Sequence, residues 1–147
     1  MTTRKERSIQ ENILPWQVFR LFCQFTTPPK NKHLLLVSTY PQPLLFMVNS
    51  HIHPYVKIHP HLMSCQVLLR AREHYFLAHD SYVDCRDVYT HFSLSDIVRQ
   101  VYSDRQRIKG FIGEDAQEQV VAAIKICPVL EKQYKNLIVD ELVELEI

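Results

Sequence analysis

The chain of 147 residues is 46% hydrophobic and 22% charged, and its formal net charge is +1. This length matches one folded domain, and a core of that size is stable without disulfides or a structural metal. No apolar run is long enough to span a membrane or to act as a secretory signal, so we expect one domain over residues 1–147, in the cytoplasm and without a membrane anchor.

The four cysteines are expected to be reduced and buried. Each lies in an apolar run, and no two of them form the close pair of a zinc site or a redox motif. Free cysteine is among the most buried residue types in proteins. The positions are Cys23, Cys65, Cys85 and Cys127.

The first two-thirds of the chain predicts short strands. Aromatic and β-branched residues between prolines favour a strand at residues 16–25, and two apolar runs at 33–39 and 44–50 predict a pair of strands joined by a proline-containing turn. Prolines and four histidines indicate a long loop from 50 to 64, with at most a short strand at 55–58.

Three further apolar pieces, at residues 65–69, 75–77 and 81–85, have the spacing of a small antiparallel barrel. The sheet is expected to end before residue 93.

Beyond that point the hydrophobic period changes to that of a helix. Ser93 is a suitable N-cap with Asp96 three residues on, and Leu94, Ile97, Val98 and Val101 follow at helical spacing. After glycines at positions 110 and 113, a second helix is predicted at residues 114–126, limited by Pro128. Residues 137–147 fit a short strand and a third helix equally well.

Charge is unevenly divided along the chain. Residues 1–113 hold 14 Lys and Arg against 8 Asp and Glu, whereas residues 114–147 hold 3 against 8. A basic body suits phosphate or an acidic partner, and an acidic end suits a basic partner or screens the body. Two ordinary solvated surfaces explain the same counts equally well.

Several segments occur in an order that is found in one family of small proteins. KHLLLVS at residues 32–38 looks like a strand that opens on a basic residue and ends in serine, and VNS at 48–50 looks like a strand end with a Thr/Ser pair. A His…Ser-x-Val segment follows at 73–85, and RQRIKGFI at 105–112 looks like a joint before a final helix. Over about residues 16–130 this order resembles the PemK/MazF-like toxin family.

The resemblance implies an α+β fold. A small SH3-like antiparallel β-barrel would cover about residues 16–92, and C-terminal helices would cover about residues 93–147. It also implies a homodimer and a toxin that is paired with a cognate antitoxin protein.

The activity implied by this family is cleavage of single-stranded RNA without a metal. Such cleavage needs a base for the 2′-hydroxyl, a cation beside the phosphorane and an acid for the leaving oxygen. Arg86 is the first candidate for the cation, with Arg70 and Arg72 as alternatives, His74 or His79 could be the acid or base, and Ser50 is a candidate phosphate contact. Ordinary surface residues and strand-end caps are the alternative interpretation of these side chains. The candidate RNA-binding residues are Arg70, Arg72 and Lys32.

A non-catalytic binding module for protein or nucleic acid is the alternative. Active members open with a Pro-Gly-acidic turn, where this chain has Pro15-Trp16-Gln17. The best register also puts Asp84 at the place of the catalytic arginine, with Arg86 two residues further along the same strand face.

Other chemistries are less well supported. His51 and His53, like His59 and His61, are spaced as metal ligands on an extended chain, but no carboxylate or cysteine stands close by, so structural or solvent-exposed histidines are favoured and no metal or cofactor is expected. There is no G-x-S-x-G elbow for a hydrolase triad, and two glycines cannot build a phosphate-binding loop.

Overall fold

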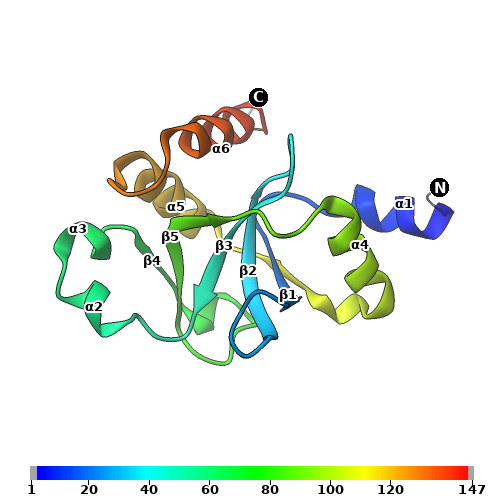
Figure 1. Cartoon of the computed structure of the whole chain (residues 1–147), viewed down its shortest axis with the longest axis horizontal. Helices are drawn as coiled ribbons and strands as arrows, with labels where there is room; N and C mark the ends of the chain where they lie inside the picture. The colour runs from blue at the N-terminus through cyan, green and yellow to red at the C-terminus, as the bar shows by residue number, and fades with distance from the viewer. Residues whose placement is uncertain (1–2, 146–147) are drawn as a thin grey trace.

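The computed structural model describes residues 3–145, and its framework is one six-stranded sheet in the order β4-β5-β3-β2-β1-β6. The strands are β1 (Gln17–Cys23), β2 (Lys30–Ser38), β3 (Leu44–Asn49), β4 (Gln66–Leu69), β5 (Ser81–Tyr89) and β6 (Ile108–Phe111). Every neighbouring pair is antiparallel. The sheet curls into a half-barrel with helices on both faces, so the fold is α+β (Figure 1).

β2 and β3 lie at the centre of the sheet and are buried on both faces. The predicted pair of strands is confirmed, with Leu35 opposite Phe46 and Leu34 opposite Met47. Leu35 and Phe46 belong to one core, whereas Leu34 and Met47 belong to a second core on the other face. Burial on both faces explains why these strands read as continuous apolar runs.

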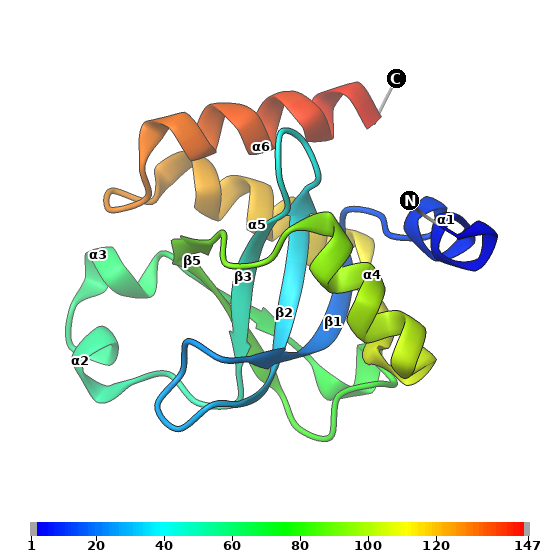
Figure 2. The same cartoon turned by 45° about the vertical axis from the view of Figure 1, so that its right-hand side comes forward.

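The first core lies between the sheet and two C-terminal helices, α5 (Glu114–Ile126) and α6 (Lys132–Leu145). Figure 2 shows both helices lying along one side of the sheet. The predicted helix at 114–126 is confirmed, and the ambiguous segment from 137 is helical as far as residue 145, because Ile138 packs into this core. Residues 146 and 147 of that prediction lie outside the described residues.

The second core lies under α4 (Leu94–Ser103) and α1 (Arg4–Glu11). The predicted cap of α4 is confirmed, since Ser93 Oγ accepts the Asp96 amide and the Asp96 carboxylate accepts the Ser93 amide. α1 was not predicted, because only Ile9 of its residues is buried and one apolar side chain gives no periodic signal.

All four cysteines are buried and unpaired, as expected. Burial raises the pKa of the Cys65 thiol to about 12, with a further contribution from the neighbouring Cys127 thiol. These groups therefore act as small apolar side chains of the core. Among residues 3–145, no helix combines the length and the apolar character needed to cross a membrane.

Three local predictions were wrong. The segment at 55–58 is not a strand, because two single-turn helices, α2 (Pro54–Lys57) and α3 (Pro60–Met63), each begin at a proline that suits the first helical turn. Residues 75–77 are not a strand either. They follow a short 3-10 helix, η1 (Ala71–Glu73), within the loop between β4 and β5.

The sheet also does not end before residue 93. β6 pairs with β1, with Gly110 opposite Val18 and Ile108 opposite Phe19, and a bulge lies between these pairs. Because β6 has only four residues and its partner lies far away in the sequence, no local pattern marks it as a strand.

The loop between β4 and β5 crosses the first core and reaches β6, on the opposite edge of the sheet. Buried His74 accepts the Gly113 amide on Nε2 at 3.0 Å, while its Nδ1 bonds the Arg70 carbonyl at 2.8 Å. The Tyr75 hydroxyl donates to the Lys109 carbonyl at 2.8 Å. The loop thereby closes the open side of the half-barrel.

Candidate functional site

A polar groove opens on the face of the sheet that carries the second core, which we call the second face, where β4 and β5 extend beyond α4. Its volume is about 380 Å³, and the segment leading into α2 forms its outer wall. We define the polar groove by the residues that line it: Asn49, His51, Ile52, His53, Pro54, Val56, Gln66, Asp84 and Arg86. This volume lies in the lower range of small-molecule sites, which is roughly 300–1,000 Å³.

Strand alternation brings the polar side chains of the groove to one face. Leu45 and Met47 of β3 face the second core, so Asn49, two residues on, faces the same side. Asp84 of β5 lies opposite Met47 on one neighbouring strand and opposite Gln66 on the other. The second face thus changes from apolar under α4 to polar beyond it.

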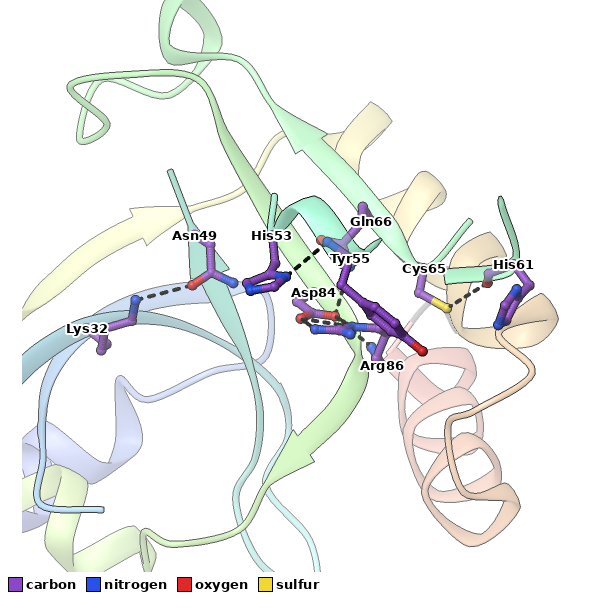
Figure 3. A network of polar contacts seen from close by, with 9 residues as sticks. All are labelled: Lys32, Asn49, His53, Tyr55, His61, Cys65, Gln66, Asp84 and Arg86. Atoms are coloured by element: carbon purple, nitrogen blue, oxygen red, sulfur yellow. Dashed lines mark hydrogen bonds and ion pairs between the residues drawn. The ribbon is translucent and has the colours of Figure 1, made fainter. Parts of the chain in front are cut away.

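The floor of the groove is an ion pair between Asp84 and Arg86. Arg86 Nη2 and Nε donate to the carboxylate at 2.8 and 2.9 Å, and the Arg86 amide donates to the same group at 3.1 Å. Gln66 Nε2 adds a donor at 3.0 Å. The hydrogen bonds to Asp84 raise the pKa of Arg86. The two charges neutralise each other, and Asp84 is fully hydrogen-bonded (Figure 3).

The rim of the groove carries hydrogen-bond donors. Lys32 Nζ donates to Asn49 Oδ1 at 3.2 Å, and burial lowers the pKa of Lys32, helped by the nearby charge of Lys30. His53 Nδ1 accepts the Tyr55 amide at 3.1 Å, so a neutral ring carries its proton on Nε2. Within the described chain, His53 Nε2 and the Asn49 side-chain nitrogen have no hydrogen-bond partner. The groove therefore suits a ligand that is rich in acceptors.

The structure brings some of the sequence-predicted site residues together. Arg86 is in the groove, and Lys32 lies on its rim, where it donates to Asn49 (Figure 3). Ser50 follows Asn49 at the end of β3 and is exposed, but it does not line the groove. These are one candidate cation, one RNA-binding candidate and the phosphate-contact candidate.

The remaining candidates belong to the loop between β4 and β5, which packs on the first core rather than beside the groove. His74 is 2% exposed, and both of its ring nitrogens are already hydrogen-bonded. That geometry gives His74 a structural role. His79, Arg70 and Arg72 are exposed on the same loop.

Two groove residues escaped the catalytic prediction. His51 and His53 line the groove together with Arg86, although the sequence pattern had raised them only as metal ligands. The sequence signal for this location was their position directly after Ser50, at the end of a predicted strand. Among the side chains that the structure describes, no group of three or more His, Cys, Asp or Glu is placed to hold a metal ion.

No protein-family model matches this chain, and no curated protein matches it either. The chemistry of the polar groove is therefore the basis for assigning a function.

Proposed function

We propose that this protein is a non-catalytic, PemK/MazF-like binding module that holds single-stranded RNA in its polar groove. The observation that carries the proposal is the state of Arg86. A cation that stabilises a phosphorane must have its charge available to the phosphate oxygens. The charge of Arg86 is instead neutralised by three side-chain hydrogen bonds to Asp84, so no guanidinium is free in the groove, while Lys32 and the other donors remain for binding.

RNA fits the groove better than a peptide because of the donors on its rim. Unpaired bases present acceptor edges and the backbone presents phosphate oxygens, both of which suit Lys32, Asn49 and His53. The cavity of about 380 Å³ has the scale of one small ligand, such as a single flipped nucleotide. The curled antiparallel sheet supports an SH3-like barrel at the level of its architecture.

The test is fluorescence anisotropy with a labelled single-stranded RNA of mixed sequence. The native protein is expected to bind, and Lys32→Ala and Asn49→Ala are expected to weaken binding about tenfold each, the cost of losing one charged hydrogen bond. Lys125→Ala removes an exposed charge from α5 and serves as the matched control. Absence of binding by the native protein would reject the proposal.

A second candidate function is the metal-independent endoribonuclease of a toxin–antitoxin pair. It is favoured by one observation, the presence of His51 and His53 beside Arg86 in the same groove. In this proposal the two imidazoles act as acid and base. Incubation of RNA with the native protein in a chelator would then leave fragments that end in a cyclic phosphate, and His51→Ala, His53→Ala and Arg86→Ala would each abolish them. Intact RNA in all four samples rejects cleavage and leaves binding in place.

The partners implied by the resemblance are proposals of the same kind. A homodimer would be detected by sedimentation equilibrium of the native chain. A cognate antitoxin is expected to be encoded by a short reading frame beside the gene, and a toxin would arrest growth when expressed alone in the cytoplasm.

A further inference from the structure

A second group of basic side chains lies on the face of the sheet opposite the polar groove. Arg20 of β1 and His33 of β2 are direct cross-strand partners. Arg20 lies two residues from Val18, and His33 lies two residues from Leu35. Because Val18 and Leu35 belong to the first core, Arg20 and His33 face the same side of the sheet as that core. Lys109 of β6 is near enough to His33 to affect its ionisation. We call Arg20, His33 and Lys109 the basic cluster.

The basic cluster has no compensating acid. The two ion pairs between described side chains join Arg86 to Asp84 and Arg99 to Asp96, and neither includes a residue of the cluster. The side chains of Arg20 and Lys109 form no hydrogen bond within the described chain. Burial lowers the pKa of His33, and the charges of Lys109 and Arg20 lower it further. Uncompensated like charges oppose folding, and such a group is favoured where an anion binds.

A further cation, Arg107, stands beside the cluster without a carboxylate partner. Arg107 Nη1 donates to the Arg20 carbonyl at 2.8 Å and to Asn31 Oδ1 at 2.9 Å, both neutral acceptors. Its Nε is buried and has no hydrogen-bond partner among the described residues. Arg107 therefore adds a positive charge at this end of the sheet, because neither of its acceptors is charged.

An aromatic ring is fixed next to the cluster. Tyr75 is 88% exposed, yet its hydroxyl is held by the carbonyl of Lys109 at 2.8 Å. A large exposed ring that is anchored at one end offers a flat surface on which a base can stack. Basic side chains beside such a ring are the pattern of proteins that bind single-stranded nucleic acid.

We propose that the basic cluster binds backbone phosphates of single-stranded RNA while Tyr75 stacks on a base. The inference rests on the proposed function, and it extends the RNA path from the polar groove to the other face of the sheet. Lys32 and His33 are consecutive on β2, so their side chains point to opposite faces. One RNA strand therefore passes around this end of β2, touching Lys32 on one side and the basic cluster on the other.

The experiment measures RNA affinity against salt concentration for the native protein and an Arg20→Ala/Lys109→Ala variant. Removing two phosphate contacts is expected to reduce the slope of log K against log salt by about 1.4. Tyr75→Ala is expected to weaken binding at least about fivefold, whereas Tyr75→Phe keeps the stacking ring and retains binding. The control is Lys125→Ala/Lys132→Ala, which removes two exposed charges from α5 and α6 and is expected to keep the native slope.

The outcomes separate this inference from the proposed function. If Lys32→Ala weakens binding but the Arg20/Lys109 variant keeps the native affinity and slope, the cluster is not on the RNA path and the groove proposal stands. If the native protein binds no RNA, both fail. If a polyglutamate peptide displaces the RNA as well as unlabelled RNA does, the cluster is a general anion surface and the inference is overturned. If the Arg20→Ala/Lys109→Ala variant has a lower melting temperature than the native protein, Arg20→Gln/Lys109→Gln is used in its place, because glutamine keeps the aliphatic part of each side chain.

Discussion

At the scale of single residues, the Asp84–Arg86 pair governs both stability and ligand binding. The Arg86 side chain is 27% exposed and the Asp84 side chain 13%, so the pair is partly shielded from water. Asp84→Ala leaves a guanidinium without its acceptor, and Arg86→Ala leaves a carboxylate with fewer donors. Each is expected to lower the free energy of unfolding by about 1.5–3 kcal/mol, the usual range for hydrogen bonds to charged groups.

Urea unfolding of both single variants and of the double variant tests this prediction. The double variant is expected to lose less than the sum of the two, because neither charge is left unpaired. Arg72→Ala, at an exposed site with no ion pair in the described chain, is the control. Additive losses would show that the pair does not act as a unit.

The same pair predicts a gain of function. Asp84→Asn keeps the shape of the side chain but removes the negative charge, so Arg86 becomes available to a phosphate. RNA binding is expected to tighten several-fold, since hydrogen bonds between ionised groups are about twice as strong as neutral ones. An unchanged or weaker affinity by anisotropy would contradict the binding role of the groove.

His33 predicts a loss of stability in acid. Its folded pKa lies below the ordinary value of 6.5 because of burial and of the charges of Lys109, Arg20 and, more weakly, Lys32. The unfolded chain therefore binds a proton more readily, and stability is complete above about pH 6.5 and decreases as the pH falls toward the folded pKa. Urea melts between pH 5 and pH 7.5 are expected to show this slope in the native protein and not in His33→Gln.

At the scale of elements, α4 depends on its first turn. Ser93 and Asp96 satisfy each other's backbone amides, and the bond from the Ser93 amide lowers the pKa of Asp96. Ser93→Ala is expected to cost about 1 kcal/mol, the typical value of an N-cap. Thermal melts compare it with Ser103→Ala at the other end of α4, and equal melting temperatures would contradict the prediction.

Elements with local signals were predictable, and those fixed by distant partners were not. The cap at Ser93 and the stop at Pro128 set α4 and α5 correctly. β6 became a strand only through its pairing with β1, and the last segment became a helix because Ile138 enters the first core. Pro54 and Pro60 indicate a loop in the sequence, although in the structure each begins a helical turn.

The candidate site was predictable to a similar degree. Lys32 and Arg86 come to one face of the sheet through strand alternation, a pattern that the sequence shows, whereas Ser50 lies just past the end of β3. The burial of His74 was not visible, because it depends on Gly113, which lies far away in the chain. His51 and His53 reach the groove through the path of a loop, which no periodicity describes.

At the scale of the whole molecule, the loop between β4 and β5 joins distant parts of the chain. His74 bonds the residue that caps α5, so the loop and the first core are held as one unit. His74→Ala is expected to lower the free energy of unfolding by about 1–3 kcal/mol, because it removes two partly buried hydrogen bonds, to the Gly113 amide and the Arg70 carbonyl. Hydrogen exchange is expected to be faster at the Gly113 amide and through residues 71–77, while α4 keeps its native rates.

β6 is an edge strand of the sheet, and the unpaired backbone groups of an edge strand can pair with a strand of another chain. Here the Lys109 carbonyl already accepts the Tyr75 hydroxyl, and the Phe76 ring lies 3.1 Å from where a side chain on Gly110 would begin. An incoming strand would have to displace both aromatic rings before it paired. Tyr75 and Phe76 therefore protect this edge strand from edge-to-edge aggregation. Any dimer of this protein is expected to form through a different surface.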